Sequence, residues 1–297
     1  GEKEGRGEGE KRKGEGRKEK KRDKNEKKGN KGEEKKKERK RERWREMTRS
    51  GREIEEGELA GGMVISTNGK QFTAGMELTV FTSGTEMKGK ETGRVRANLM
   101  RTVLQLQKTF SCLDEARMPV LMAVQGGCIG GGVDFASACD MRYCTKDAFF
   151  CIQEINIGMT ADVGTFPRLP HLMPQGLVRE LAYTGRRLFA EEARSCGFVN
   201  AVFDTQEEML DAVMGIARDI AARSPLAVLG SKEMLNYARD HSIADGLRHI
   251  AVWQSGMFQP ADMMESFAAK SEKRDPEFDD LLPDPSALLR GPRLRRS

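Results

Sequence analysis

The feature that most constrains the fold is an apolar run that leads directly into a cluster of glycines. Residues 119–124 read PVLMAV, which has the length and character of a buried strand. Residues 126–132 then read GGCIGGG, and the following VDFASACD suits a helix. A strand, a glycine-rich turn and a helix indicate an α/β fold, with backbone N–H groups available at the start of that helix.

The flanking segments support the same class. MVIS at 63–66 predicts a strand before the turn signal Asn68-Gly69, and 141–144 and 148–152 predict two more strands. Apolar residues three and four apart predict a helix over 95–113. A capping box at 205–208 and the pair Ser224-Pro225 predict the starts of two further helices, and the pattern stays helical to about residue 270. Strands alternating with helices, then a helical C-terminal third, indicate α/β architecture.

The first part of the chain has a different composition. Residues 1–50 hold 23 Lys and Arg against 13 Asp and Glu, whereas the formal charge of all 297 residues is only +5, so the remainder is net acidic. Such a segment buries too little apolar area to offset the entropy of ordering. We therefore expect a disordered charged tail at 1–57, a catalytic domain at 58–275 and a flexible C-terminal tail at 276–297.

Two interpretations of the charged tail remain open. It can be an arm for RNA or an anionic membrane surface. It can also be a solvated stretch of mixed charge, or sequence foreign to the domain, and we favour this second interpretation. A mitochondrial transit peptide is poor in acids, which argues against that function for this tail. No run of the sequence approaches the roughly 18 apolar residues that a membrane-spanning helix needs.

Cysteines and histidines exclude some classes of site. Six cysteines lie without CxxC spacing, which predicts buried, reduced thiols of an intracellular protein. The three histidines show neither zinc-ligand nor triad spacing. We expect neither a structural zinc nor histidine-based catalysis.

Two loops are candidates for binding a ligand through the backbone. One is FTAGMEL at 72–78, and the other is Gly130-Gly131-Gly132. Two N–H groups that converge on a thioester carbonyl would form an oxyanion hole and stabilise an enolate-like intermediate. A dinucleotide site fits poorly because GxGxxG is absent, and a P-loop would need Lys-Ser/Thr after the glycines.

Three carboxylates follow the glycine cluster. They are Asp134 inside the predicted helix, Glu154 after a predicted strand, and Asp162 in MTADVGTF. Their apolar neighbours and their mutual repulsion predict raised pKa values and proton exchange near neutral pH. Each acid alone has an ordinary structural explanation, such as capping a turn or lying at the surface. The functional interpretation depends on all three lying beside the two loops.

At these residues the sequence resembles the crotonase (enoyl-CoA hydratase/isomerase) superfamily, and within it the delta-3,5-delta-2,4-dienoyl-CoA isomerase branch. The stretch that carries the resemblance is MPVLMAVQGGCIGGGVDFASACDMRYCTKDAFFCIQEINIGMTADVGTFPRLP at 118–170. GKQFTAGMEL at 69–78 and SPLAVLGSKEMLNYARDHSIADGL at 224–247 support it. The resemblance covers about residues 60–275 and implies a crotonase-like spiral of ββα units with a helical C-terminal part.

The resemblance also implies the site residues. The N–H groups of Met76 and Gly131 would form the oxyanion hole. The acyl-CoA site would be lined by Gly75, Met76, Glu77, Leu78, Thr79 and Gly132. Glu154 and Asp162 would transfer protons, with Asp134 as an auxiliary acid that tunes or orients Glu154.

The acids distinguish the branches of the superfamily. The dienoyl isomerases have Asp, Glu and Asp at spacings of twenty and eight, as at 134, 154 and 162 here. Hydratases typically have glutamates at the first two positions and no acid at the third. The implied reaction converts a 3,5-dienoyl-CoA to the 2,4-dienoyl-CoA in the β-oxidation of unsaturated fatty acids. It implies no metal or redox cofactor, since CoA is part of the substrate.

The family also suggests partners and a location. It implies a homo-trimer or hexamer with the C-terminal helices at subunit contacts, in the mitochondrion or peroxisome with the cytosol still open. Family members usually have a further strand, turn and helix before the strand at 63–66, and here the charged tail takes that place. Three alternatives remain: a 2-enoyl-CoA hydratase, a non-enzymatic RNA-binding member, and a truncated, inactive product.

Overall fold

The computed structural model describes residues 61–75 and 91–282. The chain divides into two units, 1–50 and 51–297, and every described residue belongs to the second. The tail predicted at 1–57 therefore lies outside the described residues, as does most of the tail predicted from 276 onward.

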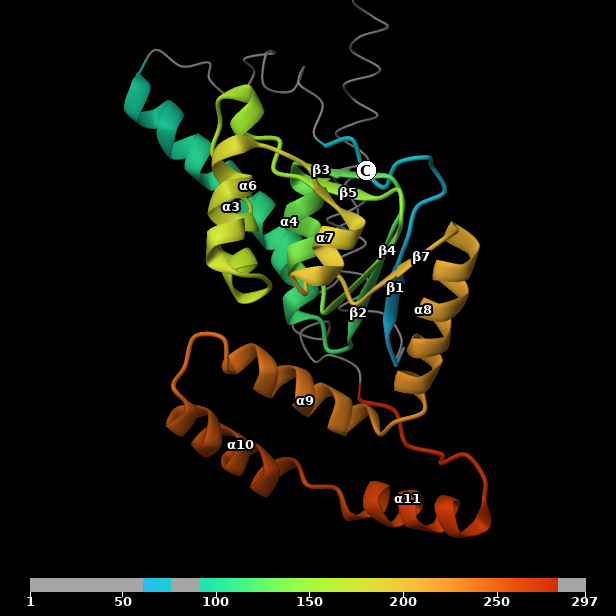
Figure 1. The fold of residues 1–297 in the computed structure, drawn as a ribbon. Helices are drawn as coiled ribbons and strands as arrows, with labels where there is room; N and C mark the ends of the chain where they lie inside the picture. Colours follow the sequence, from blue (N-terminus) through green and yellow to red (C-terminus); the bar gives the residue numbers. More distant parts are fainter. Residues whose placement is uncertain (1–60, 76–90, 283–297) are drawn as a thin grey trace, which may run out of the picture. The chain divides into compact units, whose positions relative to one another are not determined.

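The strands of the described residues form two sheets (Figure 1). The first is parallel, in the order β1 (Met63–Ile65), β2 (Val120–Val124), β4 (Met141–Thr145), β7 (Ala201–Phe203). The second has the order β3 (Gly127–Ile129), β5 (Phe149–Cys151), β6 (Leu188–Phe189), with β3 and β5 parallel and β5 and β6 antiparallel. Strands β2 and β3, and again β4 and β5, enter different sheets before a helix follows. This confirms the predicted α/β class.

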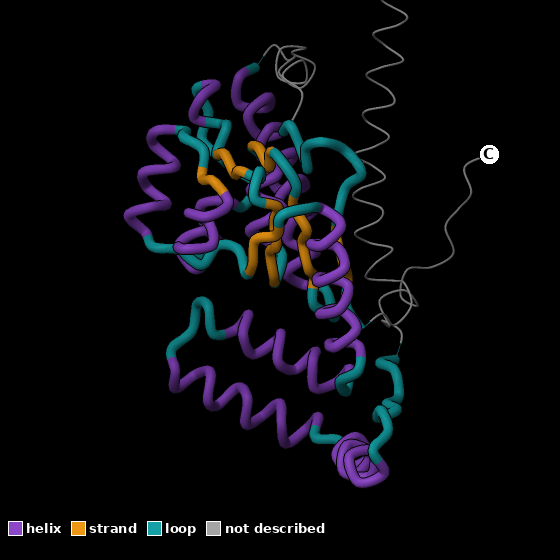
Figure 2. The backbone as a smooth tube through the Cα atoms, turned by 45° about the vertical axis from the view of Figure 1, so that its right-hand side comes forward, coloured by secondary structure: helices purple, strands orange, loops and turns teal. Residues whose placement is uncertain are grey.

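Helices make up most of the rest, and the C-terminal part is helical as predicted (Figure 2). The helices are α3 (Thr92–Glu115), α4 (Gly131–Ala138), α5 (Thr165–Arg168), α6 (Gln175–Thr184), α7 (Ala190–Ser195), α8 (Gln206–Ala221), α9 (Pro225–Tyr237), α10 (Ile243–Met257) and α11 (Pro260–Glu272). Short 3-10 helices are η1 (Ile155–Ile157) and η2 (Leu169–His171). None of the helices in the described ranges has the length and apolar character needed to cross a bilayer.

Two helix starts follow from local side-chain chemistry. Thr205 Oγ1 accepts the Glu208 N–H at 3.2 Å, and the Glu208 carboxylate accepts the Thr205 N–H at 3.3 Å, which completes the predicted capping box of α8. Ser224 Oγ accepts the Ala227 N–H at 3.3 Å, and Pro225 is the first residue of α9. Each cap satisfies an N–H that has no acceptor within its helix.

The core forms where α8 crosses the parallel sheet. Helix α8 contacts all four strands of that sheet. Leu121 and Tyr143 of the sheet pack with Met209 and Val213 of α8, and all four are buried. Strand β2 is buried along its whole length, which explains its uninterrupted apolar sequence.

Two features of the structure go beyond the sequence predictions. The glycine cluster before the predicted helix contains a further strand, β3, at Gly127–Ile129. Thr73 pairs with Cys128 there, and the Gly127 N–H bonds to the Gln71 side chain, so glycine allows neighbouring chain to approach β3 closely. The predicted apolar face of α3 is buried only towards its C-terminal end, since Leu99 is 40% exposed.

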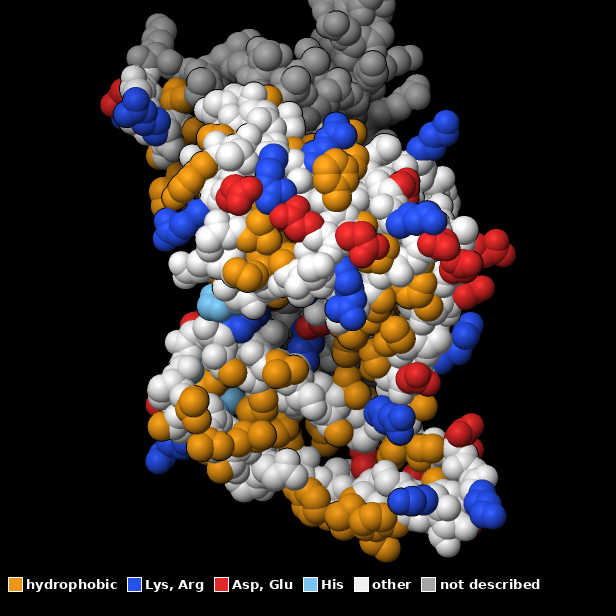
Figure 3. All heavy atoms as spheres, in the orientation of Figure 1, with side chains coloured by type: hydrophobic (Ala, Val, Ile, Leu, Met, Phe, Trp, Pro, Cys, Tyr) orange, Lys and Arg blue, Asp and Glu red, His pale blue; other side chains and the backbone are white. Residues whose placement is uncertain are grey.

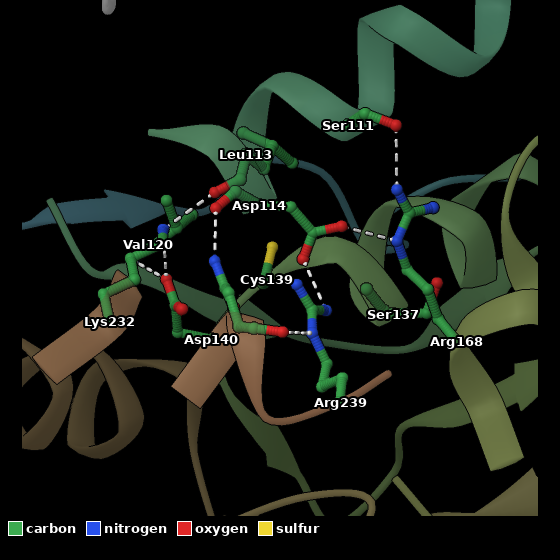
Figure 4. Close-up of polar contacts among 12 residues, drawn as sticks. Ser111, Leu113, Asp114, Val120, Ser137, Cys139, Asp140, Arg168, Lys232 and Arg239 are labelled. Atoms are coloured by element: carbon green, nitrogen blue, oxygen red, sulfur yellow. Dashed lines mark hydrogen bonds and ion pairs between the residues drawn. The ribbon is translucent and has the colours of Figure 1, made fainter. Parts of the chain in front are cut away.

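A buried lysine joins α9 to the rest of this unit (Figure 4). Lys232 is 6% exposed, and its Nζ donates to the carbonyls of Leu113 and Met118 at 2.9 and 3.0 Å and to Asp140 Oδ2 at 2.8 Å. Asp140 Oδ2 also accepts the Val120 N–H at 2.7 Å. One cation thus connects the end of α3, the start of β2 and α9.

Replacing this lysine tests its contribution to stability. Lys232→Met leaves two carbonyls and a carboxylate without their cation, so the free energy of unfolding should fall by about 3 kcal/mol. Lys270→Met, at an exposed lysine of α11, is the matched control and should change it by less than about 0.5 kcal/mol. Urea denaturation followed by circular dichroism measures both, and equal effects would show that the Lys232 contacts contribute nothing specific.

Candidate functional site

The site is organised by the parallel pairing of β3 with β5. Ile129 pairs with Cys151 at the carboxyl ends of the two strands. The Gly130 N–H extends this pairing by donating to the Cys151 carbonyl at 2.9 Å. Because parallel strands end at the same edge of a sheet, the residues after β3 and those after β5 lie side by side.

Glu154 lies against Gly130 at this edge. A Cβ built at Gly130 would lie 3.1 Å from Glu154 Oε1, and Gly130 has a φ of +57°. The backbone conformation therefore requires glycine at this position, and a side chain here would also press on the carboxylate. The Glu154 carboxylate thus lies beside the start of α4.

The amide of Gly131 is available at the same place. Gly131 is the first residue of α4, so the helix supplies no acceptor for its N–H. Within the described ranges no other group accepts that N–H either. A Cβ at Gly131 would meet only Phe110 Cζ, at 3.9 Å, among the described residues. An unbonded N–H at a helix start favours negative charge on a ligand.

Asp134 lies one turn into α4 and is fully buried. Its Oδ1 accepts the backbone N–H of Thr165 at 2.6 Å and the Thr165 hydroxyl at 2.7 Å. Its Oδ2 is buried, and no group among the described residues bonds to it. The same is true of Glu154 Oε2. Each acid thus has one buried oxygen without a hydrogen bond among the described residues.

Asp162 lies in the loop between η1 and α5 and is exposed. Its backbone carbonyl accepts the Gln107 side-chain amide of α3 at 2.7 Å. Three residues later, Thr165 bonds to Asp134. The chain from 162 to 165 is therefore fixed at both ends, to α3 and to α4.

The three acids interact electrostatically. Burial, and to a smaller extent the charges of Asp134 and Asp162, together raise the pKa of Glu154 to about 7. Burial also raises the pKa of Asp134, against the hydrogen bonds from Thr165 that lower it, and the charge of Asp162 raises it too. The structure thus brings together all three predicted acids, and Glu154 can exchange protons at neutral pH.

The other predicted loop reaches the same edge. The Thr73 N–H donates to the Gly127 carbonyl at 3.0 Å, and a Cβ at Gly75 would lie 3.2 Å from the Ile129 carbonyl. A Cβ at Gly132 would overlap the Thr73 side chain, so Gly132 packs under this segment. The remaining predicted residues of this loop, Met76, Glu77, Leu78 and Thr79, lie outside the described residues. Their binding roles, and those of Gly75 and Gly132, stay predictions.

Sequence reasoning missed several residues that shape the site. Thr165 is the partner of Asp134, and the only local signal for it is Gly164-Thr165 at the start of a helix. Arg168 Nε donates to Asp114 Oδ2 at 2.7 Å and its Nη2 to Ser111 at 3.0 Å, which holds α5 against α3 (Figure 4). Asp114 also pairs with Arg239, in the turn after α9, at 2.9 Å.

The fold and this site define a class of protein. The family model "Enoyl-CoA hydratase/isomerase" matches residues 40–281. The chain belongs to this family, which confirms the resemblance found in the sequence. Among solved structures, an enoyl-CoA hydratase of Bacillus anthracis aligns with a TM-score of 0.69 and 27% identity, over 79% of this chain and 87% of that chain.

Within the family, the chain is similar to proteins that are named as dienoyl-CoA isomerases. The "Delta(3,5)-Delta(2,4)-dienoyl-CoA isomerase, mitochondrial" of Homo sapiens is 42% identical over 234 residues, which cover 78% of this chain and 71% of that protein. The enzyme called "Delta(3,5)-Delta(2,4)-dienoyl-CoA isomerase, peroxisomal" in Arabidopsis thaliana is 38% identical over 218 residues, covering 73% and 78%.

The raised pKa of Glu154 predicts a cost in stability. Its folded pKa of about 7 lies above the ordinary 4.5, so the stability it contributes is present at acid pH and is lost as the pH rises through about 7. Glu154→Gln should therefore raise the free energy of unfolding by about 1–2 kcal/mol at a pH of about 9 and leave it nearly unchanged at about 4, below the ordinary pKa of 4.5.

Urea denaturation at the two pH values measures this difference. Glu191→Gln, at an exposed acid of α7, is the matched control and should show no pH-dependent gain. A gain for Glu154→Gln that is the same at both pH values would contradict the assigned pKa.

Proposed function

We propose that this protein is a dienoyl-CoA isomerase that converts a 3,5-dienoyl-CoA to the 2,4-dienoyl-CoA in the β-oxidation of unsaturated fatty acids. The observation that carries this proposal is the third acid: Asp162 joins Asp134 and Glu154 in one electrostatic group beside the Gly131 amide. The named dienoyl-CoA isomerases that resemble this chain support the same reaction.

The amide of Gly131 would hold the thioester oxygen. Removal of a proton from C2 of the substrate moves negative charge onto that oxygen and forms a dienolate. An N–H at a helix start, already oriented and without a competing acceptor, stabilises the charge as it develops. By similarity to the family, the Met76 amide is the second donor of this oxyanion hole.

The two proton transfers fall to Glu154 and Asp162. One carboxylate removes the C2 proton, and the other protonates C6, so the double bonds move from C3 and C5 to C2 and C4 with no net change in atoms. The pKa of about 7 lets Glu154 accept and release a proton at neutral pH. Asp134 is the auxiliary acid, since its charge raises the pKa of Glu154.

The proposal needs no metal or redox cofactor, because the carboxylates and the amides account for both proton transfers and the CoA group arrives with the substrate. The location we propose is the mitochondrion or the peroxisome. Relatives named for each compartment support it.

An absorbance assay tests the reaction. Adding enzyme to 3,5-dienoyl-CoA should increase absorbance as the conjugated 2,4-dienoyl-CoA forms. Glu154→Gln and Asp162→Asn should each lower kcat by about a hundredfold or more, because each removes one proton-transferring group. Asp211→Asn, at an exposed acid of α8, is the control and should keep full activity.

Full activity in either site variant would contradict the assigned roles. The same preparation assayed with crotonyl-CoA separates an isomerase from a hydratase. Hydration of crotonyl-CoA faster than isomerisation of the dienoyl substrate would reject the proposed function in favour of a hydratase.

We also propose that the protein is a homo-trimer or hexamer, with its C-terminal helices at the subunit contacts. Large apolar side chains are exposed on α9 to α11, and orange side chains gather over these helices in Figure 3. Those at least 60% exposed are Leu235, Ile243, Leu247, Val252, Met264 and Phe267. An exposed apolar area of this kind is typical of a protein interface.

Analytical ultracentrifugation tests this assembly. The wild-type protein should sediment as a trimer or hexamer, and Leu247→Glu should shift it to monomer because a buried, unpaired carboxylate is costly at an interface. Met214→Glu, at a 42% exposed apolar residue of α8, should leave the assembly intact. A monomeric wild-type protein would reject the proposed oligomer.

A further inference from the structure

The fully buried acid of the site, Asp134, is bonded by a single residue among those that the structure describes. Asp134 is fully buried, and both donors that reach it come from one residue, Thr165. Both bond to the same oxygen, Oδ1, while the buried Oδ2 has no partner among the described residues. A carboxylate with two donors on one oxygen is held in a single orientation, with its second oxygen directed away from those donors.

Thr165 is itself held firmly. It is 1% exposed and is the first residue of α5, directly after Gly164, whose φ of +145° suits only glycine. The Arg168 guanidinium occupies the place where a Gly164 side chain would lie, and it is fixed by Asp114 and Ser111 of α3. The donors that hold Asp134 are thus supported from α3.

The short segment that ends at Thr165 also carries Asp162. Only two residues separate Asp162 from Thr165, and the Asp162 carbonyl is bonded to Gln107. The bonds from Thr165 to Asp134 therefore connect α4 to the segment that carries Asp162. The placement of both Asp134 and Asp162 thus depends on Thr165.

We propose that Thr165 is a positioning residue of the acid group: its amide and hydroxyl hold Asp134 in one orientation and fix Asp134 relative to the segment that carries Asp162. This inference rests on the proposed function for its kinetic consequence. Its structural consequence can be measured without any activity.

The hydroxyl also favours the charged form of Asp134. Burial raises the pKa of Asp134, while the two bonds from Thr165 lower it. Loss of the hydroxyl should raise that pKa further, and a neutral Asp134 would no longer raise the pKa of Glu154. The ionisable groups that interact with the Asp134 charge are Cys128, Glu154, Asp162 and Arg168.

Thr165→Val tests the proposal, because valine keeps the shape and the amide but lacks the hydroxyl. The kcat for 3,5-dienoyl-CoA should fall about tenfold, the equivalent of one charge-assisted hydrogen bond, with KM unchanged since Thr165 is buried under Asp134. The limb of the pH–rate profile that reports Glu154 should move to lower pH. Thr165→Ser restores the hydroxyl and should restore both kcat and the limb.

The Asp134→Asn background gives a second kinetic readout. Without a charge at 134, Thr165→Val should move the limb that reports Glu154 no further. A limb that moves equally in both backgrounds, or a serine variant that behaves like the valine variant, would overturn the proposal.

Unfolding in urea tests the inference independently of activity. The destabilisation caused by Thr165→Val should be larger at a pH of about 9 than at about 3.5, below the ordinary pKa of an aspartate, because the lost bond serves the charged form of Asp134. Thr109→Val, which deletes another buried hydroxyl, on α3, is the matched control and should destabilise equally at both pH values. Thr165→Ala takes the place of the valine variant if that variant does not fold.

These readouts separate the two proposals. A wild-type protein without isomerase activity but with a pH-dependent Thr165→Val effect would reject the proposed function and retain the positioning role. A pH-independent Thr165→Val effect in an active enzyme would reject the positioning role and retain the function.

Discussion

The parallel pairing of β3 with β5 is the constraint on which the site depends. It places the end of one strand, where the glycines begin α4, next to the end of the other, where Glu154 follows. The bond from the Gly130 N–H to the Cys151 carbonyl continues the ladder one residue beyond the strands. A shift in this register would separate the amide of Gly131 from the carboxylate of Glu154, even if every helix kept its place.

Two acids of the site, Asp134 and Glu154, are buried in a way that lowers the stability of the fold. Asp134 is fully buried, and one oxygen of Asp134 and one of Glu154 are buried without a partner among the described residues. Burial of such groups lowers stability unless they take up protons, which is why their pKa values rise. A fold that keeps carboxylates in this state has the proton-exchanging groups that the proposed isomerisation requires.

Much of the fold and of the candidate site could be predicted from the sequence, because the sequence patterns that indicate them are local. The capping box of α8, the Ser224-Pro225 start of α9 and the buried run of β2 are each encoded within a few residues. The three acids were identified by their spacing together with the family resemblance, and the structure brings them together. Long-range contacts could not be predicted this way. Thr165 lies 31 residues from Asp134, and Lys232 resembles a surface residue until it meets carbonyls 114 and 119 residues away.

The glycines of the Gly130–Gly132 run differ in what the described fold requires of them. Gly130 needs its positive φ, and a side chain at Gly132 would collide with Thr73. At Gly131, by contrast, the described residues leave room for a methyl group, since the nearest atom is 3.9 Å from where it would stand. Natural variation at position 131 would then be limited by the ligand that must approach its amide and not by folding. At this one residue, selection for catalysis therefore acts separately from selection for stability.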